Sequence, residues 1–158
     1  MNEYNFCKNK LMIYGSSKGR LQQFYNENKM SEENRREIVG KYVDKYYPIF
    51  SGVLSYYKSV PIPIDKLLNN KWTKYTNKYW GTKWDARQVC FYFNREKKDA
   101  PLHYYFINDK PPIQWLNSAS LLYPDLKFVL ECEYNYNTKI IFEYKNGEQI
   151  NHKIEKRY

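Results

Sequence analysis

The residues best suited to binding chemistry form one short block, Trp80-Gly81-Thr82-Lys83-Trp84. Its two indole rings have flat faces on which a nucleic-acid base can stack, and the cations Lys83 and Arg87 can contact phosphate. Gly81 allows the backbone to turn where a larger residue would clash. The block therefore predicts a binding surface for a ligand that is both aromatic and anionic.

The same block also has a structural interpretation. Large aromatic side chains usually contribute to a core, and the aliphatic stem of Lys83 can lie over an indole while its charge stays in water. We favour this interpretation and expect at least one of Trp80 and Trp84 to be buried. The two interpretations differ in what they predict for stability and for binding.

The candidate binding residues extend beyond this block to other basic and aromatic side chains. The full set is Trp80, Thr82, Lys83, Trp84, Arg87, Lys110 and Trp115. No catalytic residue is predicted. A metal site is not expected, because neither His103 nor His152 has a close-spaced cysteine or acidic partner. We therefore expect a non-enzymatic protein without a cofactor.

Other weak signals for chemistry have simpler explanations. A nucleophilic Cys7 or Cys90 would need a nearby base, whereas a cysteine on an alternating strand is usually a small buried hydrophobe. The segment Ser16-Ser17-Lys18-Gly19-Arg20 is the nearest approach to a phosphate-binding loop, because it opens a helix and carries two cations. An ordinary capped helix start explains it equally well.

Glu131 and Glu133 lie on the same face of a predicted strand and suggest a pair of carboxylates. We expect them instead on a solvated outer face, where Lys139 or Lys145 can pair with them across a hairpin. This pattern predicts ion pairs and not an acid–base site.

The charge of the chain favours anionic partners. The 158 residues carry a formal net charge of +9, which suits nucleic acid, nucleotides or an acidic protein surface. Lysine greatly outnumbers arginine, and asparagine and tyrosine are also abundant, as AT-rich coding favours. The basic surface can therefore reflect either binding of an anionic partner or the amino-acid bias of an AT-rich genome.

The elements that must position these residues follow from hydrophobic periodicity. Strands are predicted near residues 9–14, 87–94, 102–107 and 126–134, and helices near 17–28 and 112–123. A helix opening at Ser31 should run through an apolar stripe to Tyr47, and another capped by Asp65 should continue to Tyr79. Asn146-Gly147 predicts a hairpin that ends in an edge strand.

This order predicts an α+β protein with a ferredoxin-like (βαββαβ) antiparallel sheet. A helical insertion of about residues 31–85 follows the first helix, and a C-terminal β-hairpin extends the sheet. We expect one domain over residues 1–158, because the length suits a single core. The two helices near 17–28 and 112–123 should cover the same face.

Several motifs together resemble the YubB-type family of phages, plasmids and large DNA viruses. They are the strand Cys7-Lys8-Asn9-Lys10-Leu11, the element Pro61-Ile62-Pro63, the tryptophan block 80–84, the pair Pro111-Pro112, and the segment Tyr123 to Phe128. One departure is Asn108-Asp109-Lys110, where the family has Thr-Ala-Trp. The resemblance implies a ferredoxin-like domain and an origin in a virus or mobile element, but no activity.

We therefore expect an accessory protein that binds a host or viral protein, for example to inhibit a host-defence or regulatory protein. The alternatives are a nucleic-acid or nucleotide binder using a basic aromatic surface, and a virion structural component. Weak nucleic-acid binding is expected in any case. The chain has no apolar run near the length of a membrane span and no secretion signal, so we expect it in the cytoplasm of the host cell.

Overall fold

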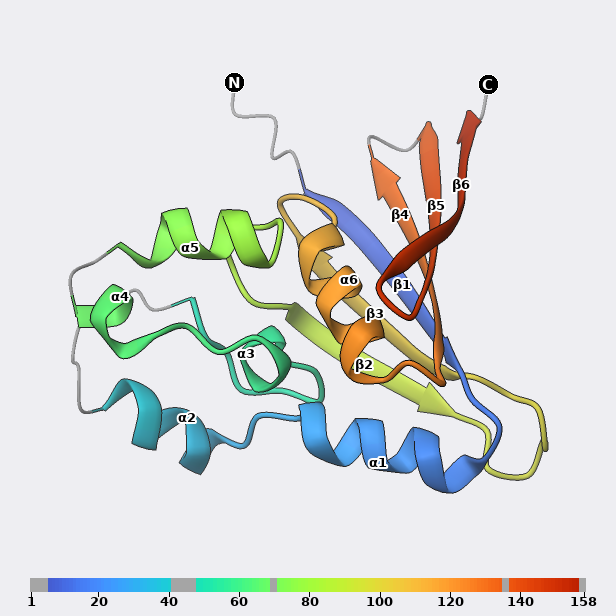
Figure 1. The fold of residues 1–158 in the computed structure, drawn as a ribbon, viewed down its shortest axis with the longest axis horizontal. Coiled ribbons are helices and arrows are strands. Elements are labelled where there is room, and N and C mark those ends of the chain that lie inside the picture. Colours follow the sequence, from blue (N-terminus) through green and yellow to red (C-terminus); the bar gives the residue numbers. More distant parts are fainter. Residues whose placement is uncertain (1–5, 41–47, 69–70, 135–136, 157–158) are drawn as a thin grey trace.

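The computed structural model describes residues 6–40, 48–68, 71–134 and 137–156. Within them, six strands form one antiparallel sheet (Figure 1). The strands are β1 (Cys7–Tyr14), β2 (Arg87–Phe93), β3 (Leu102–Asn108), β4 (Lys127–Tyr134), β5 (Thr138–Lys145) and β6 (Glu148–Lys156). All four strands predicted near 9–14, 87–94, 102–107 and 126–134 belong to this sheet, as expected.

The strand order is β2-β3-β1-β4-β5-β6, which places β1 between β3 and β4. Leu11 lies opposite Tyr104 on one side and Leu130 on the other, and all three are buried. Side chains alternate between the two faces of a strand, so this register gives every strand a defined inner and outer set.

Six helices lie in the described residues. They are α1 (Lys18–Asn28), α2 (Glu32–Val39), α3 (Tyr56–Ser59), α4 (Ile64–Leu68), α5 (Trp72–Tyr79) and α6 (Ile113–Leu122). Helices α1 and α6 lie on the same face of the sheet (Figure 1). Phe24 of α1 packs edge-on against Tyr104 and Phe128, with ring centroids 6.3 and 5.6 Å apart. The expectation that both helices cover one face is therefore confirmed.

Helices α1 and α2 begin where serine side chains cap them. The Ser17 hydroxyl accepts a hydrogen bond from the Arg20 N–H at 3.2 Å, and the Ser31 hydroxyl accepts one from the Asn34 N–H at 3.0 Å. The helix predicted from Ser31 to Tyr47 is present as α2 up to Val39, and residues 41–47 lie outside the described residues.

The single helix predicted from Asp65 to Tyr79 is a wrong prediction. Two helices, α4 and α5, occupy this stretch. Leu67 and Trp72 are both buried. In one continuous helix they would point about 140° apart, because each residue adds about 100°. Two shorter helices let both side chains reach the core.

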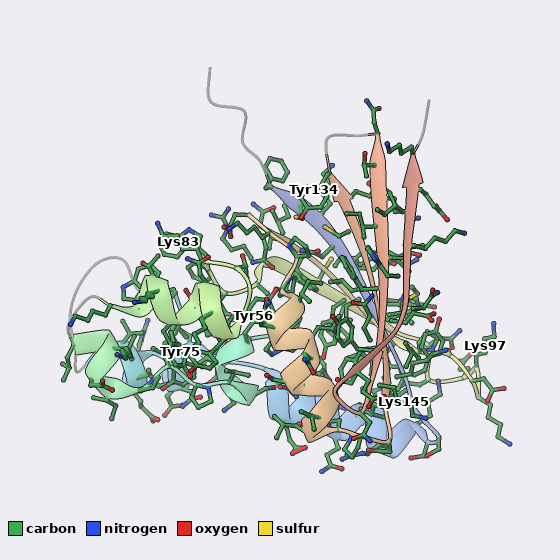
Figure 2. The ribbon with its side chains drawn as sticks, turned by 45° about the horizontal axis from the view of Figure 1, so that its top comes forward. Tyr56, Tyr75, Lys83, Lys97, Tyr134 and Lys145 are labelled. Atoms are coloured by element: carbon green, nitrogen blue, oxygen red, sulfur yellow. The ribbon has the colours of Figure 1, made fainter. Side chains whose placement is uncertain are left out.

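One buried cluster joins the insertion to the sheet. It includes Tyr56 and Ile62 of the insertion together with Leu11, Phe106 and Leu116. Figure 2 shows Tyr56 beside α6, between the insertion and the sheet. Tyr56 also donates a hydrogen bond from its hydroxyl to the buried Asn108. The insertion therefore shares the hydrophobic core of the sheet.

Asp85 fastens the insertion to the start of β2. Its carboxylate accepts hydrogen bonds from the N–H groups of Tyr56 (2.8 Å), Ala86 (2.9 Å) and Phe50 (3.2 Å), and from the Ser55 hydroxyl (2.5 Å). Burial nevertheless raises the pKa of Asp85 to about 7, although these hydrogen bonds act to lower it. The cost of desolvating the carboxylate outweighs its donors.

Candidate nucleic-acid interface

The tryptophan block forms part of the core and not a stacking platform. The Trp80 side chain is 0% exposed, and its indole N–H donates to the Val60 carbonyl at 2.9 Å. Trp115 of α6 is also fully buried. The expectation that at least one block tryptophan is buried is confirmed. The rings of Trp80 and Trp115 therefore cannot receive a ligand at the surface in this structure.

Thr82 is buried as well, and its hydroxyl donates to Asp109 at 2.5 Å. Nearby, the side-chain amide of Asn108 donates to the Trp84 carbonyl at 3.1 Å. These bonds tie the block to the segment that precedes Lys110. Asn108 and Asp109, which depart from the family pattern, thus have structural roles here.

Lys83 and Trp84 are the half-buried members of the block. The Lys83 ammonium lies 5.0 Å from the centroid of the Trp84 ring, as the core interpretation predicted. Trp84 in turn lies against Trp72, with ring centroids 5.1 Å apart, and is stacked on Phe50 at 6.2 Å. Its faces are therefore occupied by neighbours.

Arg87 and Lys110 are exposed, unlike the aromatic members of the candidate set. Lys110 lies in the connection between β3 and α6, and Arg87 lies opposite Ile107 on β2. Whether these two cations bind a ligand stays a prediction. Of the two, only Arg87 lies on a strand of the sheet.

The face of the sheet opposite α1 and α6 carries a row of aromatic rings. We define the open face as the outer side chains of β1, β2 and β3, namely Lys8, Lys10, Met12, Tyr14, Arg87, Cys90, Tyr92, His103, Tyr105 and Ile107. Tyr92 is 58% exposed and Tyr105 is 41% exposed. Tyr105 is the neighbour of His103 on the same face of β3, and Tyr92 lies opposite His103 on the edge strand β2.

The geometry of this row suits stacking. The His103 and Tyr105 rings are nearly parallel, with an interplanar angle of 8° and centroids 6.4 Å apart. Tyr92 lies 6.0 Å from His103 across the β2–β3 pair. Neighbouring side chains on one strand face project in the same direction, so the three rings adjoin one another, with His103 and Tyr105 parallel and Tyr92 tilted by 55° against His103.

Positive charge accompanies the rings. Lys10 lies directly opposite Tyr105 on β1, and Arg87 lies on the same face of β2. None of the described residues of the open face is acidic. Burial, and then the positive charge of Lys10, lowers the pKa of His103 below its ordinary 6.5, so His103 is neutral at pH 7.

The other half of the same sheet side has a different character. Glu131 of β4 pairs with Lys139 of β5 at 3.4 Å, as predicted, and Lys153 of β6 pairs with Glu155 at 3.1 Å. Acidic and basic side chains therefore alternate there and compensate one another. Cations outnumber carboxylates around the aromatic row, where Glu131 and Glu133 of β4 lie directly opposite Lys10 and Lys8 of β1.

Sequence reasoning missed the aromatic row because alternation alone does not say which face is covered. The alternation places Cys90 and Tyr92 on one side of the strand and predicts a buried Cys90. Cys90 is exposed, since it points to the open face, whereas Cys7 and Cys132 point toward the helices and are buried. The available signal was the period-two spacing of His103 and Tyr105 in one strand and of Cys90 and Tyr92 in the other, which places each pair on one face.

Within the described residues, no group of three or more histidine, cysteine, aspartate or glutamate side chains could hold a metal ion. His103 and His152 lie on β3 and β6, which β1, β4 and β5 separate. None of the described helices is both long and apolar enough to cross a membrane.

The fold is similar to that of the protein api92 from Yersinia pseudotuberculosis, which is known from a crystal structure and carries the family name DUF1281. The TM-score is 0.60, with 98% of each chain covered and 10% of the residues identical. At this level of identity the similarity concerns the fold alone. The sequence itself matches no family model and no curated protein.

Proposed function

We propose that this protein binds single-stranded nucleic acid on the open face of its sheet. The observation that carries the proposal is the row of exposed Tyr92, half-buried His103 and exposed Tyr105 beside Lys10 and Arg87. Stacking of a base on an aromatic ring contributes about 1–3 kcal/mol per base, and cations contact the phosphates between the bases. The row thus supplies both contacts that a single strand requires.

The architecture supports the same proposal. We propose that β1 to β4 with α1 and α6 form a ferredoxin-like unit, to which the insertion and the β5–β6 hairpin are added. The order β2-β3-β1-β4, with both helices on one face, supports this assignment. RNA-recognition modules use aromatic residues on a four-stranded sheet to stack two or three bases.

Single strands fit this surface better than duplexes. The bases of a duplex are stacked on one another and cannot reach Tyr92 or Tyr105 without unpairing. A duplex would contact only the cations and would bind with a steep dependence on salt. We therefore expect a preference for single strands and little preference for sequence.

Fluorescence anisotropy with a labelled oligothymidylate tests this function. Exchanging both Tyr92 and Tyr105 for alanine should weaken binding by about 1–3 kcal/mol per base lost. Tyr105→Phe should bind like the unchanged protein, because it keeps the ring. Lys97→Ala, in the β2–β3 connection and outside the open face, should change affinity far less than the double alanine variant. Equal affinity of the double alanine variant and the unchanged protein would refute the proposal.

A protein partner is the second candidate function, in line with the expected accessory role. Strand β6 is a sheet edge, and Ile150 and Ile154 on it are 51% and 55% exposed. An edge strand can pair with an extended segment of another protein through main-chain hydrogen bonds. Such binding would persist at about 0.3 M salt, where contacts between exposed charges are largely screened.

The resemblance to YubB-type proteins supports an origin in a virus or mobile element and action in the cytoplasm of a host cell. Two of the motifs that carry the resemblance lie together in the structure. The indole N–H of Trp80 donates to Val60, immediately before Pro61-Ile62-Pro63, and the hydroxyl of Tyr75 donates to Pro61 at 3.0 Å. Family membership remains part of this proposal.

A further inference from the structure

A second basic and aromatic surface lies on the helical insertion. A hollow of about 820 Å³ opens between α4 and α5. Its lining includes Lys66, Lys71, Lys74, Tyr75, Lys78 and Tyr79. Figure 2 shows Tyr75 among the helices of the insertion, on the side of the molecule away from Lys145 and β5. None of the lining residues belongs to the open face, so the hollow is separate from the aromatic row.

The lining of the hollow follows helical periodicity. Lys71, Lys74, Tyr75, Lys78 and Tyr79 are spaced i, i+3, i+4, i+7 and i+8, so they occupy one face along α5 and its first flanking residue. The core-facing positions of the same helix are Trp72 and Thr76, which are buried. The helix therefore turns one face to the core and a cationic, aromatic face to the hollow.

The charge of the hollow is unbalanced. Its lining contains four lysines, and no described residue of the lining is acidic. Lysines at i and i+3 or i+4, such as Lys71 with Lys74 and Lys74 with Lys78, repel one another and destabilise a helix. An anion with several charges, bound among them, would remove this repulsion. Phosphate groups meet this requirement.

The two tyrosines add a surface for a ring. Tyr75 and Tyr79 have centroids 4.5 Å apart, and the Tyr75 hydroxyl is held by the Pro61 carbonyl at 3.0 Å. Tyr79 is 42% exposed, and the Lys78 ammonium lies 5.2 Å from its centroid. An exposed aromatic ring directly beside the lysines suits the base of a nucleotide.

We propose that the hollow between α4 and α5 binds a nucleoside polyphosphate, with the base against Tyr79 and the phosphates among Lys66, Lys71, Lys74 and Lys78. This site is independent of single-strand binding on the open face. Inorganic polyphosphate shares the phosphate chemistry but lacks the base. The ring contact is what distinguishes the two sources of phosphate.

Isothermal titration with ATP and with tripolyphosphate tests the site. The variant K74A/K78A should bind ATP at least about tenfold more weakly, a loss of about 1.4 kcal/mol. Tyr79→Ala should weaken binding of ATP but leave binding of tripolyphosphate unchanged. The pair K97A/K98A removes the same charge from the β2–β3 connection and should bind ATP normally (Figure 2).

Absence of ATP binding, or binding that K74A/K78A leaves unchanged, would overturn the proposal. Equal losses of ATP and tripolyphosphate binding in Tyr79→Ala would overturn the assignment of a nucleotide. Thermal melts verify that each variant is folded. The melting temperature should change little, because the exchanged side chains line an open hollow. The Tyr92 and Tyr105 alanine variant should bind ATP normally, so failure of this site and failure of single-strand binding are distinguishable.

Discussion

The main chains of Trp80 and Trp115 are joined by a hydrogen bond, in which the Trp115 N–H donates to the Trp80 carbonyl at 3.2 Å. Tyr56 packs against both rings, with centroids 5.6 Å from Trp80 and 4.8 Å from Trp115. The three residues come from the end of α5, from α6 and from α3. This contact is where the insertion, the helix layer and the core meet.

Trp80→Ala should destabilise the protein by about 3–5 kcal/mol, because it removes a fully buried indole and leaves a cavity. Urea denaturation measures the change. Tyr79→Ala is the matched control, since the neighbouring ring is 42% exposed and should cost far less. Comparable losses for the two variants would contradict the role of Trp80 as a core residue.

Gly81→Ala should be strongly destabilising. Gly81 has φ +82°, and a Cβ there would lie 2.2 Å from Gln114 Oε1 and 3.1 Å from the Ile113 nitrogen. Left-handed strain alone costs about 1–3 kcal/mol. Gly19→Ala in α1 is the control, because a Cβ there has nothing within 4 Å and alanine favours a helix. A melting temperature of Gly81→Ala equal to that of the unchanged protein would refute the close approach to α6.

Asp85 should make stability fall as pH rises from about 4 to about 7. Burial raises its pKa from 3.8 to about 7, so the folded protein holds a proton that the unfolded chain releases in this window. The state that binds fewer protons is favoured as pH rises, and here that is the unfolded state. Above about pH 7 this contribution is constant.

Asp85→Asn isolates this effect. The variant should lose the slope in unfolding free energy between pH 5 and pH 8, measured by urea denaturation at both values. It should also be less stable by about 1–3 kcal/mol, since the amide NH₂ cannot accept the bonds that the Phe50 or Tyr56 N–H donates. Asp99→Asn, at an exposed loop position, should keep the slope.

Binding of single strands should strengthen as pH falls below about 6.5. The pKa of His103 is lowered by burial and by Lys10, so this side chain gains its charge only in that range. A charge on His103 would add a cation to the aromatic row. Anisotropy titrations at pH 7.5 and 5.5 measure the change, which His103→Gln should abolish and His152→Gln should retain. A pH response that survives His103→Gln would contradict this role.

Local features of this protein were readable from its sequence. Ser17 and Ser31 cap helices, Asn146-Gly147 makes the β5–β6 turn with φ values of 50° and 75°, and the alternating residues Phe128, Leu130 and Cys132 of β4 are buried. Each depends on neighbours within a few residues, through main-chain conformation or side-chain period. The Glu131–Lys139 pair followed in the same way from one hairpin.

Tertiary structure alone decided which aromatic residues reach the surface. Tyr104 and Tyr105 are neighbouring rings in one predicted strand, yet one is fully buried and the other 41% exposed. The difference arises because α1 and α6 cover one face of the sheet and leave the other open, which depends on contacts between distant segments. The break between α4 and α5 has the same origin, since Leu67 and Trp72 both reach a core that other elements form. Sequence periodicity identifies faces, but only packing determines which face is covered.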